Sequence, residues 1–551
     1  MDIKVIAVIV CMLAVLIYAS YDAERKRRLK LEKRLRNSWG KPSDKKITQE
    51  EYEIISHYFK DYIQDKNEYI DDITWDDLEM DDVFLRINHT DSFAGEQILY
   101  HKLHDVSAAG DQEKFEKRQQ FLKENEKKRI EIEQNLFAIG KNKNDYYMMS
   151  FLKNTDKWKV GNEILMYIMQ FLLVFFIVSF ACTRLDIMGV GAVLTAFINI
   201  SIYMRIKQKY EVFFESLGNF KNIYNFARWI VKDETLGDIF ADDKTKASVE
   251  KLKRMTNAIV SLNTRKQGTM SGDLGSIVAE YLMAVTLIDV AAFNRTMKII
   301  ENKQTDVIGL IEFAGDIDAQ ISVLSYRQSM EGGWCRPEYN SEGISAEQLV
   351  HPLLGNPVAN DFAVKTRAII TGANASGKST FMKAAAINML LAQTINTCTA
   401  KSFKASHMYV MTCMSLRDDV LSGESYYFRE ARYLKRMIDV IDSRTNVLCV
   451  VDEILKGTNT HERIAASKAI LDYIAKDNCI ALIATHDMEL TETDLYNKFY
   501  FDSTVLNDDI VFDYKIHEGI GGKSNAIALL EILGYPKTIV ERARRGAERK
   551  V

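Results

Sequence analysis

A glycine-rich loop that ends in a lysine and a serine is the segment of the chain best suited to chemistry. The residues GANASGKS, from Gly372 to Ser379, match the pattern GxxxxGK[ST] in full. Glycines let such a loop wrap closely, so that successive backbone N–H groups and the start of the next helix face phosphate oxygens. Lys378 is then placed to reach the β and γ phosphates of a nucleotide, and the Ser379 hydroxyl to bind Mg²⁺.

Two further polar groups follow apolar runs downstream of this loop. Asp452 and Glu453 come directly after the run 446–451, and His486 comes shortly after the run 479–484. Phosphate transfer needs one carboxylate to hold the Mg²⁺ shell and another to orient the attacking water. We therefore expect Asp452 to bind the metal, Glu453 to act as the catalytic base and His486 to sense the γ-phosphate.

Short strands and helices must position these residues. Residues 368–371 form a short apolar run before the loop, and a segment rich in Ala, Met and Leu follows it. After Pro357 short β-rich runs alternate with helical segments, which is typical of an α/β domain. Residues 205–330 have a helical pattern with few breakers, and so do residues 50–152, where an acidic stretch at 71–82 indicates turns and solvent-exposed faces.

Length and composition exclude several classes of protein. The chain has 551 residues. At roughly 150 residues per domain, this length predicts three or four domains. Apolar residues make up 47% and prolines number only 5, so a collagenous or mostly disordered chain is excluded. A net charge of −4 argues against a basic nucleic-acid coat. The seven cysteines include no CxxC pair, which argues against structural zinc.

Three apolar runs predict membrane helices. The first is 5–21, and a strongly basic stretch follows it, an order opposite to that of a secretory signal. The second and third are 164–183 and 187–204, each about long enough to cross ~30 Å of hydrocarbon, with only three residues between them. Lysines and arginines flank this pair on both outer sides, so its tip is expected to face away from the cytoplasm. The alternative is a buried hairpin in a soluble core.

These observations predict a multi-pass protein of the cell membrane with its C-terminal domain in the cytoplasm. The basic stretch after the first apolar run, at 22–49, favours contact with anionic membrane lipids. The alternative is that this stretch is an arm that binds nucleic acid. The predicted divisions are a transmembrane anchor at 1–21, a basic cytosolic stem at 22–49, a helical core region at 50–163, a transmembrane hairpin at 164–204, a helical lever or core region at 205–335 and an α/β domain at 336–551.

Four segments carry a resemblance to a known family. They are TGANASGKST at 371–380, SLRDDVLSGESYYFRE at 415–430, VVDEILKGTNTHER at 450–463 and ATHDMEL at 484–490. In order and spacing they resemble the ATPase motifs of the MutS DNA mismatch repair family. HPLLGNPVAND at 351–361 is similar to the entry of its ATPase domain, residues 87–103 to the start of its core and lever region, and residues 521–543 to its C-terminal dimerisation segment.

The resemblance implies a P-loop ATPase of the ABC type that works as a homodimer through its ATPase domain, with ATP and Mg²⁺ as cofactors. It implies that Ser425 reaches the γ-phosphate held by the opposite subunit. The residues expected to bind phosphates and Mg²⁺ are Gly372, Asn374, Gly377, Lys378, Ser379, Thr380 and Asp452, and those expected to act in catalysis are Lys378, Glu453 and His486.

Two departures from the family pattern qualify the expected function. An anchor and a stem occupy residues 1–50 where the family has its mismatch-reading domain, and a membrane hairpin interrupts the helical region. The sequence therefore predicts a membrane-anchored, ATP-dependent dimeric clamp, with mismatched or branched DNA as a further expected partner. The alternative is an ATP-driven membrane scaffold or tether that does not bind DNA.

Overall fold

The computed structural model describes residues 3–43, 45–62, 68–106, 112–153, 163–253, 281–339, 342–414, 426–456, 459–506, 509–521 and 526–548. The chain divides into two compact units, which we describe separately. The first comprises Met1–Gln64, Asn88–His101 and Glu113–Tyr326, and the second comprises Asp65–Ile87, Lys102–Gln112 and Arg327–Val551. The predicted fold class, a helical N-terminal region followed by a C-terminal α/β domain, is confirmed.

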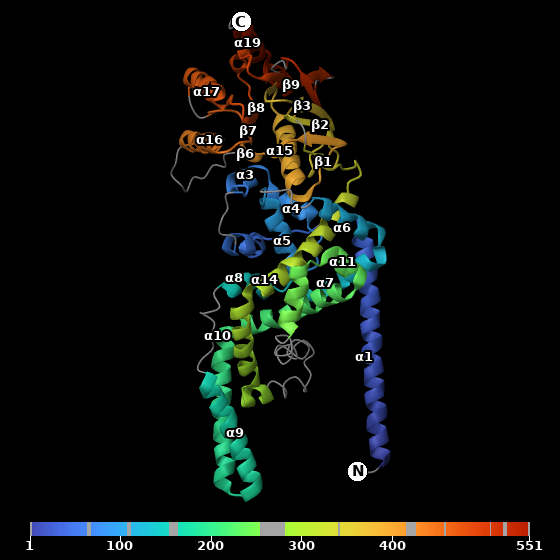
Figure 1. Cartoon of the computed structure of the whole chain (residues 1–551). Coiled ribbons are helices and arrows are strands. Elements are labelled where there is room, and N and C mark those ends of the chain that lie inside the picture. Colours follow the sequence, from blue (N-terminus) through green and yellow to red (C-terminus); the bar gives the residue numbers. More distant parts are fainter. Residues whose placement is uncertain are drawn as a thin grey trace. The chain divides into compact units, whose positions relative to one another are not determined.

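The regular secondary structure described in the first unit is all helical (Figure 1). Its α-helices are α1 (Ile3–Ser38), α2 (Gln49–His57), α5 (Phe93–His104), α6 (Gln112–Glu124), α7 (Glu126–Ile139), α8 (Met148–Lys153), α9 (Glu163–Thr183), α10 (Asp186–Lys232), α11 (Glu234–Phe240) and α14 (Ile288–Gln328), with short helical turns η1 (Tyr58–Tyr62) and η2 (Lys143–Tyr147). Residues 243–253 and 281–286 add two further helical segments. The last residues of α5 and α14 and the first residue of α6 are counted in the second unit.

Helices α9 and α10 form an antiparallel hairpin that turns at Arg184 and Leu185. The two helices approach closely, because a Cβ atom added at Gly191 would lie only 2.7 Å from the Phe176 ring. Most of their apolar side chains nevertheless face outward: only 11% of the apolar window in Ile164–Thr183 and 17% of that in Asp186–Gln208 is buried. A core hairpin of a soluble protein buries such side chains, so the exposure favours the membrane interpretation.

The described part of the chain contains two helices that are long and apolar enough to cross a membrane, whereas the sequence predicts three. The third expected span, at 5–21, lies in helix α1, whose backbone is continuous from Ile3 to Ser38. The side chains of residues 3–17 lie outside the described ones. That span therefore stays a prediction. Helix α10 also continues well past the predicted end of the hairpin at residue 204.

The second unit contains two sheets. The six-stranded sheet has the order β10-β9-β4-β8-β7-β6, parallel except for the antiparallel pair β9–β10, and the four-stranded sheet has the order β1-β5-β2-β3. The strands are β1 (Pro337–Glu338), β2 (Ile344–Leu349), β3 (Asn360–Val364), β4 (Arg367–Gly372), β5 (Ser402–Ala405), β6 (Tyr409–Cys413), β7 (Val447–Asp452), β8 (Cys479–Ala484), β9 (Asn497–Leu506) and β10 (Asp509–Glu518).

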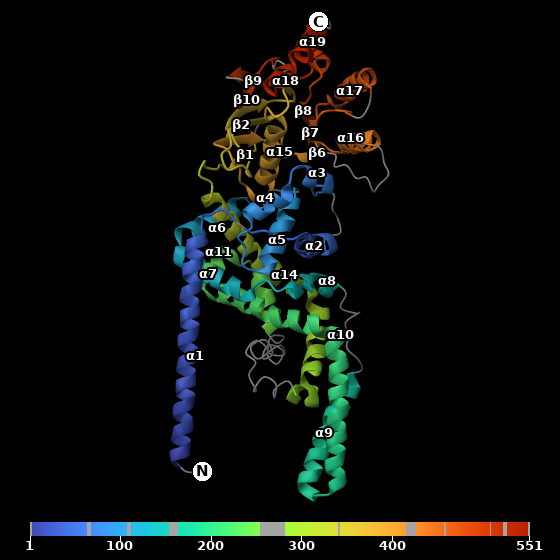
Figure 2. The same cartoon turned by 180° about the vertical axis from the view of Figure 1, so that it is seen from behind.

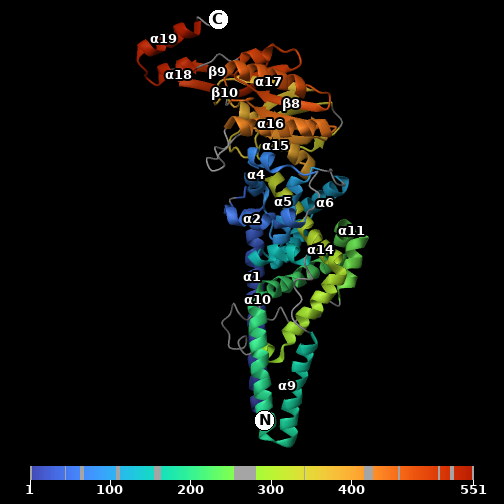
Figure 3. The same ribbon diagram turned by 90° about the vertical axis from the view of Figure 1, so that its left-hand side faces the viewer.

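Helices cover both faces of the six-stranded sheet. They are α15 (Lys378–Ile395), α16 (Tyr426–Ser443) and α17 (Thr460–Ile474), followed by the turn η5 (Met488–Glu492) and by α18 (Ala526–Ile532) and α19 (Lys537–Glu548). Residues of α16 and α17 pack with one face of the central strands in a single apolar core. Helix α15 lies between the two sheets (Figures 1 and 2), which explains why it is buried on nearly all sides. Figure 3 shows α18 and α19 projecting from the six-stranded sheet.

The acidic stretch at 71–82 is not the set of solvated turns that its composition indicates. It forms α3 (Asp72–Asp77) and the start of α4 (Met80–Ile87), which belong to the second unit. Its acids have partners there: Asp71 pairs with Arg436 on α16, and the buried Asp77 accepts a hydrogen bond of 2.8 Å from the Thr412 hydroxyl on β6. Composition misleads here because the partners lie more than 330 residues away.

Candidate functional site

The glycine-rich loop joins β4 to α15 and has a backbone that only certain residues adopt. Gly372 has a φ of 145° and Gly377 a φ of 107°, in the left-handed region that glycine enters without strain. A Cβ atom at Gly372 would also lie 2.8 Å from the carbonyl oxygen of Phe501 on β9. Both glycines are therefore required by the loop's geometry, as the motif predicts.

Lys378, the first residue of α15, folds back over this loop. Its Nζ donates hydrogen bonds to the carbonyl oxygens of Gly372 at 2.8 Å and Ala373 at 2.9 Å. Burial lowers the pKa of Lys378, and the nearby carboxylates of Asp452 and Glu453 oppose that shift. The loop thus holds an ammonium group close to the start of a helix, where phosphate groups also bind best.

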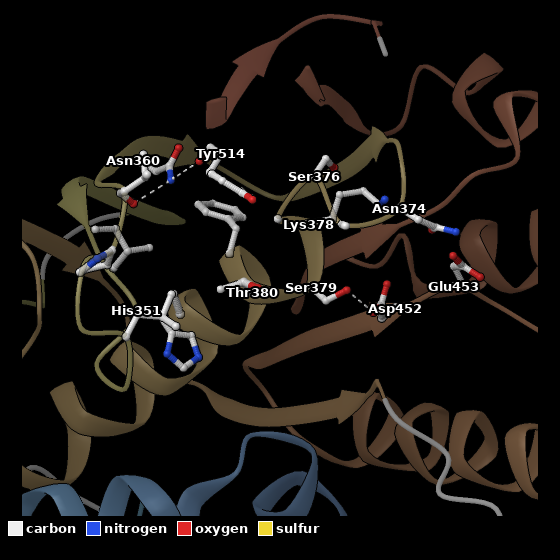
Figure 4. A pocket seen from close by; sticks show the side chains of 18 of the residues that line it. His351, Asn360, Asn374, Ser376, Lys378, Ser379, Thr380, Asp452, Glu453 and Tyr514 are labelled. Carbon is white, nitrogen blue, oxygen red and sulfur yellow. Dashed lines mark hydrogen bonds between the residues drawn. The ribbon is translucent and has the colours of Figure 1, made fainter. Parts of the chain in front are cut away.

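Two oxygen groups from separate elements meet beside the lysine. The Ser379 hydroxyl donates a hydrogen bond of 2.6 Å to Oδ2 of Asp452, at the end of β7 (Figure 4). Mg²⁺ prefers oxygen ligands and usually binds one or two protein groups together with waters and phosphates. The hydroxyl and carboxylate fit that preference. In the described residues no group of three or more His, Cys, Asp and Glu side chains could hold a metal ion, so any metal here would need other ligands as well.

Glu453 lies one residue beyond β7 and makes two charged contacts. Its carboxylate is 2.9 Å from Nε2 of His486, just after β8, and 3.2 Å from Nζ of Lys456. The hydrogen bond from His486 is the main cause that lowers the pKa of Glu453 to about 2; burial opposes it and Lys456 adds to it. Glu453 also has a φ of 62°, an uncommon conformation for a residue with a side chain.

The structure therefore brings most of the predicted site residues into one pocket of about 400 Å³. Figure 4 shows Asn374, Asp452 and Glu453 at one end of it and His351 and Asn360 at the other. Of the predicted residues, those that line it are Asn374, Gly377, Lys378, Ser379, Thr380, Asp452, Glu453 and His486. Gly372 begins the loop without lining the pocket. Ser425 lies outside the described residues.

Sequence reasoning assigned no role to the other wall of the pocket. It consists of apolar side chains and a few polar groups: Leu349, His351, Leu354, Asn356, Pro357, Val358, Asn360, Phe381 and Tyr514. Asn360 joins β3 to β10, because its Oδ1 accepts from Ile516 N at 2.8 Å and its Nδ2 donates to Tyr514 O at 3.1 Å. Part of this wall could have been found from the sequence, because residues 351–361 carry the HPLLGNPVAND segment. No sequence feature indicates Tyr514.

A comparison with known families agrees with this geometry. Residues 368–549 match the family model described as MutS domain V. The C-terminal part of the chain is therefore similar to domain V of MutS proteins. The matched residues include the glycine-rich loop and the carboxyl ends of β7 and β8, the same elements that form one end of the pocket.

Several MutS proteins are similar to this chain over less than half of its length. The DNA mismatch repair protein MutS of Leptospira interrogans is 29% identical over 276 residues, which cover 46% of this chain and 32% of that protein. The MutS of Natronomonas pharaonis is 30% identical over 224 residues, 38% and 26% of the two chains, and that of Thermotoga maritima is 29% identical over 255 residues, 44% and 32%. The chain thus spans about a third or less of the length of these relatives.

Proposed function

We propose that the chain is a membrane-anchored ATPase of the MutS type. The observation that carries this proposal is the hydrogen bond of 2.6 Å between Ser379 and Asp452, within one pocket that also contains Lys378 and Glu453. A phosphate cradle, an oxygen pair suited to Mg²⁺ and a carboxylate for water are the groups that hydrolysis of a nucleoside triphosphate requires. The apolar wall around Tyr514 suits a nucleoside base at the opposite end of the same pocket.

Each residue has a separate part in the proposed reaction. The loop N–H groups and Lys378 bind the phosphates and favour the charge that develops on them. Ser379 and Asp452 would hold Mg²⁺, which when bound neutralises phosphate charge. Glu453 orients the attacking water and accepts its proton. His486, whose ring lies 2.9 Å from that carboxylate, positions Glu453 and senses the γ-phosphate.

Two substitutions test the ATPase proposal on the full-length protein. Glu453→Gln should bind ATP with unchanged affinity and hydrolyse it roughly a hundredfold or more slowly, because the water loses its proton acceptor. Lys378→Ala should lose both binding and hydrolysis. ATP binding is measured by equilibrium dialysis and turnover by phosphate release. Glu489→Gln, an exposed acid on η5 outside the pocket, is the control. Normal turnover in Glu453→Gln would refute its role, and normal binding in Lys378→Ala would refute the phosphate site.

We further propose that two copies form a clamp through their ATPase domains and bind mismatched or branched DNA. The MutS relatives are named for DNA mismatch repair, which supports this extension. The alternative is an ATP-driven membrane scaffold or tether without DNA. The exposed apolar hairpin α9–α10 favours it, because this segment is suited to lipid and not to phosphate groups.

Salt dependence separates the two functions. If phosphates of DNA are bound by lysines and arginines, the affinity of the full-length protein for a mismatched duplex should fall steeply as salt rises, by roughly 10³ between 50 and 200 mM for about six contacts. Fluorescence anisotropy in detergent micelles measures this affinity. A scaffold or tether should show no binding at low salt, and that result would remove the DNA proposal while leaving the ATPase intact.

A further inference from the structure

Helix α14 begins at a bend next to the apolar hairpin. Residues 281–286 form a short helix, Leu287 has a φ of 52°, and α14 starts at Ile288. A left-handed residue between two helical segments interrupts the ladder of backbone hydrogen bonds and leaves carbonyl groups near the bend without a helical partner. Such groups must find other donors when they are buried.

Side-chain amides of the hairpin supply those donors. Gln170 on α9 donates from Nε2 to the carbonyl oxygen of Thr286 at 3.0 Å, and Asn199 on α10 donates from Nδ2 to that of Val285 at 2.7 Å. Asn199 is fully buried. Gln170 is also the residue that breaks the otherwise apolar run of α9. The two amides thus hold one bend of the chain from both sides.

These amides lie at the same depth in the hairpin. Gln170 lies fourteen residues before Arg184, and Asn199 lies fourteen residues after Leu185. At about 1.5 Å per residue, both amides are roughly 21 Å from the tip of the hairpin. The hydrocarbon core of a bilayer is about 30 Å thick, so a hairpin that crosses it would place the bend inside the hydrocarbon, on the cytoplasmic side of its middle.

Among the described residues, the segment around the bend has one buried face and one exposed face. Ala284, Leu287 and Val290 are buried. Tyr281, Leu282 and Ile288 are 62%, 60% and 53% exposed. The uncharged run 281–288 lies between Glu280 and Asp289 in the sequence, and its eight residues are too few to cross a bilayer.

We propose that residues 281–288 enter the lipid bilayer beside the hairpin and turn back at Leu287 without crossing it. This inference rests on the proposed membrane insertion of α9 and α10. Non-helical backbone is tolerated at membrane depth only where protein groups satisfy it, and Gln170 and Asn199 do so here. The occupant of the exposed face is the acyl region of the lipid, because this face is apolar and its segment is hydrogen-bonded to a hairpin whose own exposed side chains are apolar.

The same contacts continue along the start of α14 (Figures 1 and 3). Asn294 Nδ2 lies 3.6 Å from Sδ of Met166, in the first turn of α9, and the rings of Phe293 and Tyr210 on α10 lie 6.4 Å apart. Helix α14 is thus attached to both helices of the hairpin over more than one turn. Its first residues are thereby fixed against the hairpin, and a non-helical residue at Lys303, with φ −135° and ψ 27°, interrupts α14 farther along.

Labelling of cysteines in membranes tests this proposal. Full-length protein in inside-out vesicles is treated with a membrane-impermeant maleimide, and peptide mass spectrometry measures the labelled fraction of each cysteine, so native cysteines need not be removed. Leu282→Cys and Ile288→Cys should react roughly tenfold more slowly than Lys298→Cys, an exposed position farther along α14, because an apolar medium disfavours the reactive thiolate. The native Cys182, near the hairpin tip, should be labelled only in right-side-out vesicles.

The outcomes separate this inference from the membrane hairpin itself. Equal labelling of Leu282→Cys and Lys298→Cys, with Cys182 protected in inside-out vesicles, overturns the inference and leaves the hairpin in the membrane. Labelling of Cys182 from the cytoplasmic side overturns the hairpin as well. Disulfide-linked dimers through Leu282→Cys under mild oxidation would place a second copy, not lipid, on this face.

A second set of variants tests the role of the amides. Asn199→Leu removes the hydrogen-bond donor to the carbonyl oxygen of Val285. This variant should raise the labelling of Leu282→Cys, because the unsatisfied carbonyl destabilises the bend in the membrane. Thr195→Val is the matched control: Thr195 is buried on the same helix, but its hydroxyl bonds to Gly191 within α10. Protection that is unchanged in Asn199→Leu, in protein that still assembles in the membrane, contradicts the assigned role.

Discussion

His351 shows how burial sets the chemistry of one side chain in the pocket wall. It is 8% exposed, and burial lowers its pKa to about 4. The backbone N–H of Leu353 donates to Nδ1 at 3.3 Å, which fits a neutral ring. The charged groups that act on it are Glu79, which favours the imidazolium, and Lys383, which opposes it; these two form an ion pair of 2.7 Å with each other. The ring is therefore neutral at physiological pH.

This burial predicts a pH dependence of stability. The unfolded chain protonates this histidine below about pH 6.5, whereas the folded chain protonates it only near pH 4, so the free energy of unfolding should fall as pH drops between those values, by at most about 3 kcal/mol from this group. His351→Asn, which keeps an acceptor for Leu353 but does not titrate, should flatten that part of the profile in denaturant unfolding. The exposed His461→Asn should not. Parallel profiles for wild type and His351→Asn would contradict the assignment.

At the scale of elements, the C-terminal end of α15 is stabilised by an arginine from another helix. Its first turn follows the phosphate loop, and its C-terminal end is capped by Arg327, from the last turn of α14. The Arg327 guanidinium donates to Thr397 Oγ1 and to the carbonyl oxygen of Asn396, both at 2.9 Å, and lies 4.1 Å from the Trp334 ring. A cation at the carboxyl end of a helix is also favoured by the helix dipole.

Replacement of this guanidinium should destabilise the second unit. Arg327→Lys keeps the charge but loses the planar arrangement of donors, so buried carbonyl groups lose partners, at a cost of about 2–3 kcal/mol. Thermal unfolding followed by circular dichroism should show a lower midpoint for the transition of this unit. Arg336→Lys, at an exposed arginine in the same connection, is the control. An equal midpoint in both variants would show that Arg327 does not fix α15.

At the scale of the whole molecule, α19 and the connection that joins it to α18 carry apolar side chains that the described residues leave exposed. Leu533 and Ile539 are 65% and 48% exposed. In the homodimer proposed above, a second copy of this surface is expected to cover them. Leu533→Glu should shift the protein towards monomer in sedimentation velocity in detergent, because a carboxylate would be buried at the interface. Lys537→Glu adds a carboxylate nearby on an exposed position and should leave the dimer intact; equal loss in both would point to charge alone.

The positions of the glycine-rich loop and of the carboxylates beside it could be predicted from the sequence because each depends on local order. A glycine motif between a strand and a helix, and acids at a strand end, follow from adjacent residues, and the contact of Ser379 with Asp452 agrees with them. Long apolar runs likewise predicted α9 and α10, since hydrophobic length is a local property.

Contacts between distant segments were decided by the tertiary structure alone. The sequence gives no sign that Asp77 belongs with β6, that Tyr514 closes the pocket opposite Asp452, or that amides at 170 and 199 hold a bend at 287. These pairings depend on which buried polar groups can satisfy one another, and that depends on strand order and helix packing across hundreds of residues. Residue type and spacing therefore predicted which residues gather at the pocket, while burial decided which distant groups complete it.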